Sequence, residues 1–90
     1  MQRAIYKVPD GKLIKILLEE EGGSISSIQI TGDFFIYPEE NIEQLEHALR
    51  GCTREEKALT ERLEKFQHES PTEFFGLDIP SLVHTILLAQ

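Results

Sequence analysis

The side chains that could act as nucleophiles, general bases or metal ligands are few in this sequence of 90 residues. Cys52 is the single cysteine, and His47, His68 and His84 fall in different segments. None of them has the C-x-x-C or H-x-x-x-H spacing of a metal site, so the sequence predicts none. A Cys–His pair would need a proximity that spacing does not show, and Cys52 is better explained as a small packed residue. No catalytic residue is therefore predicted.

The glutamates and the paired glycines also favour structural roles. The glutamates between residues 39 and 64 are interleaved with Lys57 and Arg62, at the spacing of solvated helix faces rather than of a catalytic carboxylate pair. Gly22-Gly23 lacks the lysine and the following helix of a phosphate-binding loop, and a hairpin turn explains it better. We expect no enzymatic activity from the chain alone.

Size and composition indicate one small domain, residues 1–90. Hydrophobic residues make up 40% and charged residues 28% of the chain, as in an ordinary soluble globular protein. No apolar run approaches the ~20 residues that span a bilayer, and the first residues lack the apolar core of a signal peptide. A lone cysteine fits a reducing compartment. These features favour a cytoplasmic location.

The net charge of −7 is unevenly distributed. Residues 1–36 carry four basic and five acidic side chains, whereas residues 37–90 carry five basic and eleven acidic ones. Such an acidic surface repels phosphate backbones, so nucleic-acid binding is not expected. The basic charge that stands out belongs to the first third of the chain.

That first third has the alternation of half-buried strands. Polar and apolar residues alternate over residues 3–8, 12–19 and 25–36. Pro9-Asp10-Gly11 has the composition of a tight turn, and residues 20–23 provide a second one. Two short links between three strands predict an antiparallel meander with one buried face.

The remainder has the periodicity of helices. Pro38 suits the first position of a helix that ends at Gly51. Thr53-Arg54-Glu55-Glu56 matches the capping box that would begin a second helix. After a link at residues 67–77, Asp78 or Ser81 could cap a third. The helical residues expected to face the core are Ile42, Leu45, Leu49, Leu59, Leu63, Phe66, Leu82, Val83, Ile86 and Leu87.

The predicted fold is therefore α+β, a three-stranded antiparallel sheet followed by three helices packed on one face. Its other face would carry cations, two polar residues and several apolar side chains. They are Arg3, Ile5, Lys7, Leu13, Lys15, Leu17, Thr31, Asp33 and Phe35. This face could be a solvated surface with cross-strand charge pairs or a docking face for a partner.

The stretch "GDFF" ends the third predicted strand. Gly32 would lie on the core face between Ile30 and Phe34, where a missing side chain permits a close backbone approach or a bulge. Phe34 would point to the core and Phe35 away from it. The fold explains Gly32 and Phe34 in this way but explains Phe35 poorly.

These segments resemble the C-terminal accessory domain of lipoate–protein ligases, which in many archaea and some bacteria is a separate small subunit. The resemblance lies in "KVPDGKLIKI" at residues 7–16, "GGSISSIQITGDFFIYPEE" at residues 22–40 and "IEQLEHALRG" at residues 42–51. Beyond these it is limited to the helical pattern and "FGLDIPSLVHTIL" at residues 75–87. Asp10 stands where the family often has glycine, and Asp-Gly still suits a turn.

The resemblance implies a role that composition cannot show. Such ligases activate lipoate with ATP to lipoyl-AMP and then transfer the lipoyl group to a lysine of an acceptor lipoyl domain. In two-component forms the large subunit is catalytic, and the small subunit is needed chiefly for activation. The implied partner is thus the large subunit, in a heterodimer, with acceptor lipoyl domains contacted indirectly. ATP, Mg²⁺ and lipoate would be used by the complex, with none bound by this chain alone.

The resemblance also singles out candidate residues for partner binding or activation. They are Lys7, Lys12, Gly32, Asp33 and Phe35, which match the family's segments. Lys15 is a further candidate because it would lie with the other cations on the outer sheet face. Lys7 or Lys12 could neutralise a nucleotide phosphate or pair with acids of the partner, or could serve only the solubility of the hairpin. An alternative function is an adaptor that recruits the acceptor lipoyl domain without affecting adenylation.

Overall fold

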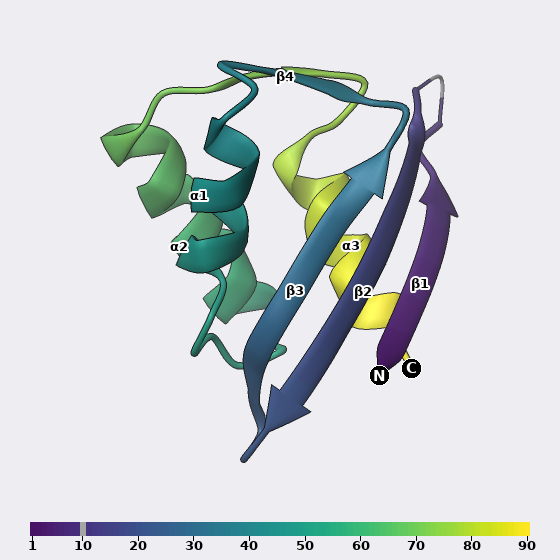
Figure 1. Ribbon diagram of the computed structural model, residues 1–90, viewed down its shortest axis with the longest axis vertical. Coiled ribbons are helices and arrows are strands. Elements are labelled where there is room, and N and C mark those ends of the chain that lie inside the picture. Colours follow the sequence, from purple (N-terminus) through teal and green to yellow (C-terminus); the bar gives the residue numbers. More distant parts are fainter. Residues whose placement is uncertain (10) are drawn as a thin grey trace.

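The computed structural model describes residues 1–9 and 11–90, so the part of the first turn that falls on Asp10 lies outside the described residues. Figure 1 shows the elements. In chain order they are β1 (Gln2–Lys7), β2 (Leu13–Glu21), β3 (Ser24–Gly32), β4 (Phe35–Tyr37), α1 (Asn41–Ala48), α2 (Glu56–Glu69), β5 (Glu73–Phe75) and α3 (Ile79–Leu88).

Strands β1, β2 and β3 form the predicted antiparallel meander. Ala4 pairs with Ile16, and Ile16 pairs with Ile30, so apolar side chains from all three strands share one face. These three residues are buried, as the alternation predicted. Helix α3 packs on β1 and β2, and α1 packs on β3. The helices cover one side of the sheet (Figure 1), which confirms the α+β prediction.

The core lies between the sheet and the helices. Leu45, Leu59 and Ile86 are completely buried there, and burial of each such side chain contributes about 1.5–3 kcal/mol. One expected core residue, Leu87, is instead 37% exposed. Because successive helical residues are about 100° apart, burial of Ile86 turns Leu87 toward solvent.

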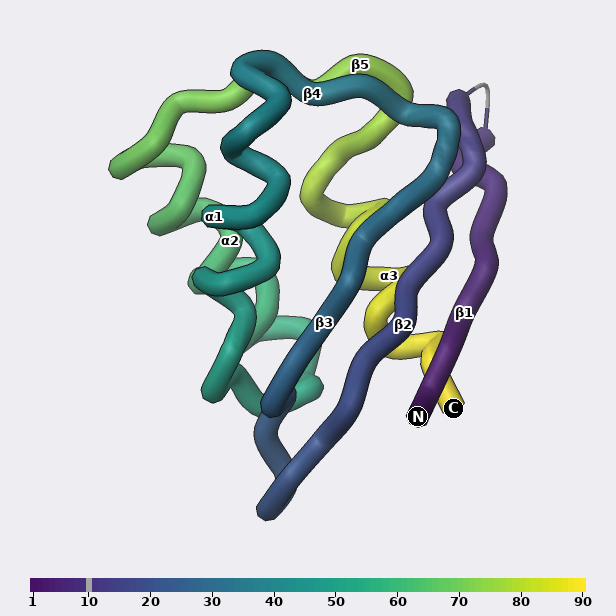
Figure 2. Tube along the Cα trace, in the orientation of Figure 1, coloured from purple at the N-terminus to yellow at the C-terminus, as the bar shows by residue number. Residues whose placement is uncertain are grey.

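A second sheet was not predicted. The strand expected over residues 25–36 ends at Gly32, and the next residues form β4, which pairs with β5 from the link expected at residues 67–77. Figure 2 shows β4 and β5 side by side across one end of the molecule. Ile36 of β4 is 5% exposed and anchors this ribbon to the core.

Two of the expected helix starts are wrong. The Tyr37–Pro38 peptide bond is cis, and α1 begins only at Asn41, whose N–H donates to the Pro38 carbonyl at 3.1 Å. Thr53 does not cap α2, because it forms a bridge with Ser24 at the edge of β3. Helix α2 begins at Glu56 without a side-chain cap.

The other helix signals are confirmed. Gly51 follows α1 with a φ of 81°, the left-handed conformation that glycine adopts most easily. The Asp78 carboxylate accepts a hydrogen bond from the Ser81 N–H at 2.7 Å and caps α3.

The chain ends meet at the end of the sheet opposite β4 and β5. The N–H of Arg3 donates to the Gln90 carbonyl at 3.3 Å, and the N–H of Gln90 donates to the Arg3 carbonyl at 3.2 Å. Arg54 donates to Glu20 Oε1 at 2.8 Å, to the Ala89 carbonyl at 2.6 Å and to the Gln2 side chain. These bonds join the start of the chain, β2 and the end of α3.

Within residues 1–9 and 11–90, none of the helices combines the length and the apolarity needed to traverse a bilayer.

Candidate partner-binding site

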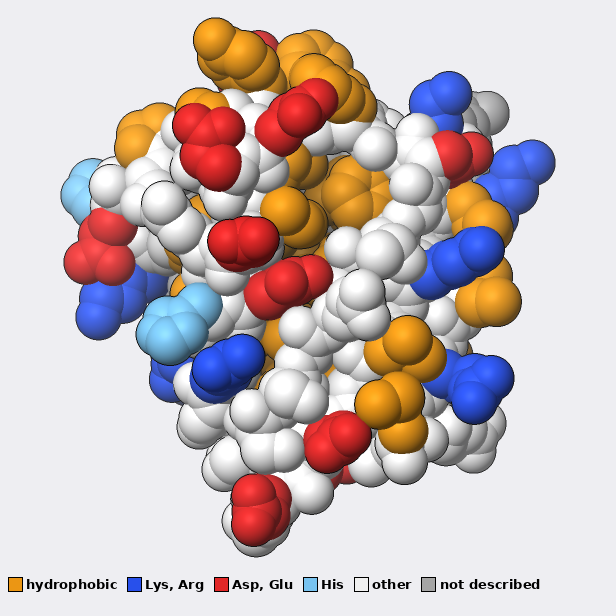
Figure 3. All heavy atoms as spheres, in the orientation of Figure 1, with side chains coloured by type: hydrophobic (Ala, Val, Ile, Leu, Met, Phe, Trp, Pro, Cys, Tyr) orange, Lys and Arg blue, Asp and Glu red, His pale blue; other side chains and the backbone are white. Residues whose placement is uncertain are grey.

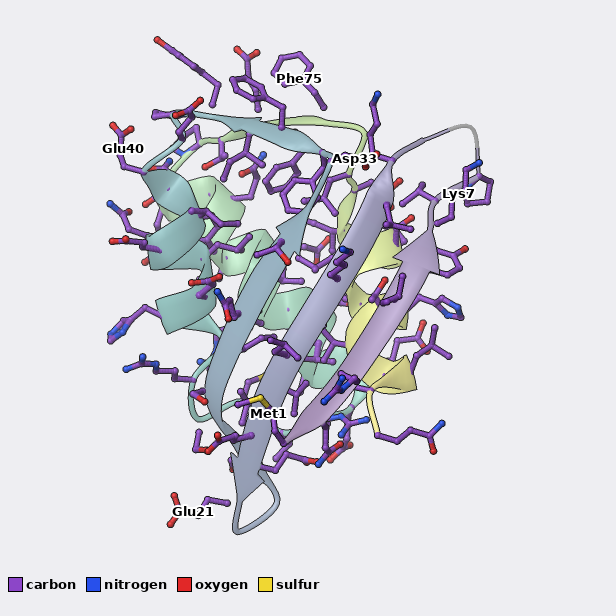
Figure 4. All side chains as sticks on the ribbon, turned by 45° about the vertical axis from the view of Figure 1, so that its right-hand side comes forward. Met1, Lys7, Glu21, Asp33, Glu40 and Phe75 are labelled. Carbon is purple, nitrogen blue, oxygen red and sulfur yellow. The ribbon has the colours of Figure 1, made fainter. Side chains whose placement is uncertain are left out.

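The end of the sheet formed by the β1–β2 turn holds several of the predicted residues. Lys7 pairs with Leu13 across the hairpin. The Leu13 N–H donates to Asp33 Oδ1 at 2.5 Å, and the Asp33 N–H donates to the Leu13 carbonyl at 3.2 Å. Figure 4 shows Lys7, Asp33 and Phe75 at one end of the molecule and Met1 and Glu21 at the other. The structure therefore places Lys7 and Asp33 at the same end of the sheet, on either side of Leu13.

Gly32 has a structural explanation. A Cβ atom there would lie 2.0 Å from the Leu13 carbonyl oxygen, and the φ of Gly32 is 151°, which side chains disfavour. The close backbone approach that the sequence predicted is confirmed. Gly32 is itself exposed, however, although its partner Ile14 belongs to the core. Gly32 and Asp33 thus hold the corner of the sheet against Leu13.

Lys12 lies beside the segment that follows β5. A Cβ atom on Gly76 would lie 2.2 Å from Lys12 Cγ, so the lysine side chain passes directly over this glycine. Gly76 follows Phe75 and has a φ of 78°. Lys12 is exposed, so its stem is placed by packing while its ammonium group stays in solvent.

Lys15 lies apart from these residues, in the middle of the outer sheet face. It pairs with Ile5 on β1 and with Thr31 on β3. Ile5 is 63% and Leu17 36% exposed, and the basic side chains of the face are exposed too. The predicted mixture of cations and apolar residues on this face is therefore confirmed.

Phe35 is not on that face, which corrects the prediction. It lies on β4 directly opposite Phe75 of β5, with the ring centroids 5.8 Å apart. Phe35 is 47%, Phe75 49% and Tyr37 62% exposed. We call Phe35, Tyr37 and Phe75 the aromatic rim.

The sequence reasoning missed Tyr37 and Phe75 as candidates. A signal was present, because the chain contains two Phe-Phe pairs, at residues 34–35 and 74–75. In each pair the first phenylalanine is half-buried and the second is exposed.

A small apolar hollow lies beside the rim, between β3, β4 and α1. Its volume is about 280 Å³, and Figure 3 shows hydrophobic side chains on its floor. The residues that line it are Ile30, Thr31, Gly32, Phe34, Phe35, Ile36, Glu39 and Ile42. The stretch "GDFF" therefore contributes to both the rim and the hollow.

Comparison with known proteins decides the family. The family model described as the bacterial lipoate protein ligase C-terminus matches residues 6–86. The chain belongs to this family. The match confirms the resemblance found in residues 7–51 and extends it into α3.

Two relatives of this lipoate protein ligase C-terminal domain come from Thermoplasma acidophilum. The first is lipoate-protein ligase A subunit 2, which is 46% identical over 43 residues, covering 48% of this chain and 46% of the relative. The chain thus matches about half the length of this curated relative. The second is a chain from a structural analysis of a bi-partite lipoate protein ligase and its E2 lipoyl domain, with a TM-score of 0.81 and 26% identity. That superposition covers 96% of this domain and 94% of the other chain.

The two ends of this lipoate protein ligase C-terminal domain differ in their ion pairs. Across the described residues the only ion pair joins Arg54 to Glu20, at 2.8 Å, at the end away from the rim. A hydrogen bond from Gln2, and then the Arg54 guanidinium, lower the pKa of Glu20. Within residues 1–9 and 11–90, neither Lys7 nor Lys12 forms an ion pair.

The possible metal ligands and the single cysteine occupy ordinary positions in the described residues. Among the residues that the structure describes, no group of three His, Cys, Asp or Glu side chains could hold a metal ion. Cys52 is buried, as expected of a packed residue, and burial raises the pKa of its thiol.

Proposed function

We propose that this chain is the small accessory subunit of a two-component lipoate–protein ligase, needed together with the large catalytic subunit for ATP-dependent activation of lipoate to lipoyl-AMP. One observation carries the proposal. The likeness to a chain of the bi-partite archaeal ligase covers nearly all of both chains, 96% of this one and 94% of that one. A domain that matches a separate polypeptide over its full length is well suited to act as a separate subunit.

An accessory subunit without catalytic groups can promote a reaction by shifting the conformational equilibrium of its partner. It must bind one conformation of the catalytic subunit more tightly than the others, because binding shifts an equilibrium only by its differential affinity. A hundredfold stimulation requires about 2.7 kcal/mol of such preference. A modest docking surface can supply this free energy.

ATP, Mg²⁺ and lipoate are assigned to the catalytic subunit in this proposal. Gly22-Gly23 connects β2 to β3 as a hairpin turn, with no helix following it that could bind phosphate. The described residues also lack a cluster of metal-binding side chains. The complex would act in the cytoplasm, where a lone cysteine such as Cys52 stays reduced. Acceptor lipoyl domains would be contacted through the catalytic subunit.

The test measures lipoyl-AMP formation by the purified large subunit with ATP, Mg²⁺ and lipoate, with and without this chain. We expect at least about a tenfold increase with the chain, saturating at one chain per large subunit. The chain alone should form no lipoyl-AMP. Equal formation in both samples would contradict the proposal.

A second assay separates activation from transfer. Synthetic lipoyl-AMP is supplied with the large subunit and an acceptor lipoyl domain, again with and without the chain. An accessory role in activation leaves this transfer rate unchanged. A slower transfer without the chain, combined with unchanged lipoyl-AMP formation, would instead show an adaptor that recruits the acceptor.

A further inference from the structure

We infer that the aromatic rim is the surface through which this chain docks on the catalytic subunit, an assignment that rests on the proposed function. The matching partner surface has an apolar projection, with carboxylates on one side of it and a cation on the other. The outer face of the three-stranded sheet, the competing candidate, is assigned no contact with the catalytic subunit.

Strand pairing forces the rim side chains outward. Ile36 and Phe74 face each other across the ribbon and point inward, where Ile36 is buried and Phe74 half-buried. Because side chains alternate along a strand, the neighbouring residues must point to solvent. Phe35 and Phe75 therefore lie on one outward surface, as does Tyr37. The fold explains the inner pair, whereas Phe35 and Phe75 contact only part of each other's surface and remain about half exposed, and Tyr37 is more exposed still.

The area of the rim is that of an interface core. Three aromatic side chains, each about half exposed, present roughly 300 Å² of surface. A standard interface buries about 800 Å² on each partner, with aromatic residues at its centre and polar residues around them. The rim thus matches the apolar centre, and the flanking charged residues would supply the remaining area.

A lysine lies on one side of the rim and two glutamates lie on the other. Lys12 passes over Gly76, next to Phe75. On the other side, Glu73 pairs with Tyr37 and Glu39 borders the hollow. Figure 3 shows acidic groups beside the hydrophobic cluster at the top of the molecule. A partner with carboxylates facing Lys12 and a cation facing Glu73 would bind in one orientation.

The hollow beside the rim fits an anchoring side chain. Its volume of about 280 Å³ is at the lower edge of the roughly 300–1,000 Å³ typical of small-molecule pockets. Phe34, Phe35 and Ile42 make its walls apolar. Interfaces often centre on one apolar residue inserted into such a pocket. The hollow therefore accommodates the projection inferred for the partner.

The outer sheet face lacks a comparable apolar surface. Ile5 pairs with Lys15, and Leu17 pairs with Arg3. Each apolar side chain thus has a charged residue directly opposite, whereas Phe35 has Phe75. Interleaved charges keep a sheet face hydrated and discourage its burial.

The binding test compares matched double variants by calorimetric titration into the catalytic subunit. Phe35→Ser with Phe75→Ser removes the two phenylalanines of the rim, and Ile5→Ser with Leu17→Ser removes two side chains of similar mean exposure from the outer sheet face. We expect the rim variant to weaken binding at least about 100-fold and the sheet variant to stay within about threefold. Circular dichroism melting confirms that both variants are folded. At saturating concentration the rim variant should restore the wild-type rate of lipoyl-AMP formation.

A charge test keeps the assignment falsifiable if the double rim variant unfolds. Lys12→Glu reverses a charge beside the rim, and Lys57→Glu makes the same change at an exposed position of α2. We expect Lys12→Glu to weaken binding about tenfold at low salt, less at high salt, and Lys57→Glu to have no effect.

Several outcomes would overturn the assignment. If the double rim variant and Lys12→Glu both bind with wild-type affinity, the docking surface lies elsewhere. The same follows if the sheet variant loses as much affinity as the double rim variant. Either result leaves the proposed function intact. Dimers of the chain alone that dissociate on rim substitution would assign the rim to a second copy. Loss of binding to the acceptor lipoyl domain alone would assign it to the acceptor. A catalytic subunit that does not bind the wild-type chain would refute the proposed function and this assignment together.

Discussion

At one end of the molecule polar groups bond to one another within the chain, whereas at the other end aromatic side chains remain exposed. At the end where the termini meet, Arg54 bonds to Gln2, Glu20 and the Ala89 carbonyl, and Arg3 and Gln90 pair through their backbones. At the other end, the aromatic rim stays exposed and Lys12 extends into solvent. The bonds made by Arg54 stabilise the fold, whereas the exposed aromatic side chains at the other end are available to a partner.

Gly32 provides the strongest test of this comparison, because it lies at the rim end but belongs to the fold. Gly32→Ala places a Cβ atom against the Leu13 carbonyl oxygen at an unfavourable φ. We expect the free energy of unfolding to fall by about 3 kcal/mol or more. Urea denaturation measures it, with Gly22→Ala as the control, since that glycine shares a positive φ but has nothing nearby. An unchanged midpoint for Gly32→Ala would show that the corner is not constrained.

Arg54 tests the opposite end. Arg54→Ala removes the hydrogen bonds that join Gln2, Glu20 and the end of α3. We expect a loss of about 2 kcal/mol in the free energy of unfolding, measured by urea denaturation, with binding to the catalytic subunit unchanged for the folded fraction. Arg50→Ala, at an exposed position, should change stability by less than about 0.5 kcal/mol. Weaker binding by folded Arg54→Ala would contradict the separation of the two ends.

Asp33 tests whether an exposed residue at the rim end contributes to the stability of the fold. Asp33→Ala removes the acceptor for the Leu13 N–H, and we expect a loss of about 1 kcal/mol in the free energy of unfolding. Asp33→Asn keeps an oxygen acceptor and should keep most of the stability. Thermal melting compares the two variants. If Asp33→Asn is as unstable as Asp33→Ala, the negative charge of Asp33, rather than its hydrogen bond with the Leu13 N–H, stabilises the fold.

Glu20 gives the smallest effect, a pH dependence at the end away from the rim. Its pKa is lowered below the ordinary 4.5 in the folded state, so its contribution to stability is present above pH 4.5 and is lost as the pH falls through the folded pKa. Wild type should therefore melt above Glu20→Gln at pH 7, and the two melting temperatures should converge at lower pH. Parallel curves at all pH values would exclude this linkage.

The parts of the fold that follow from local patterns could be predicted. Alternation in β1, β2 and β3 and the helical periodicity of α1, α2 and α3 identified most of the core. Asp78 was a recognisable cap because its partner, Ser81, lies three residues away. The capping box at Thr53 failed because Ser24, distant in sequence, pairs with it instead.

The rim could not be predicted because it depends on pairing between distant segments. Alternation continues in phase from Ile30 to Ile36, so the break after Gly32 leaves no trace in the pattern. Strand β5 has only three residues, Glu73–Phe75, too few for periodicity to show. Phe35 was therefore placed on the wrong surface, although its exposure was anticipated.

The backbone pair between Arg3 and Gln90 has a practical consequence for attaching this chain to other molecules. Both termini leave the molecule at the end opposite the rim (Figure 1), and the longest dimension is 32 Å. A tag or surface anchor at either terminus would leave the rim accessible. A fusion linker that must reach past the rim to a bound protein would need at least about ten extended residues, because each spans roughly 3.3 Å. Shorter linkers would keep a fused partner away from the rim.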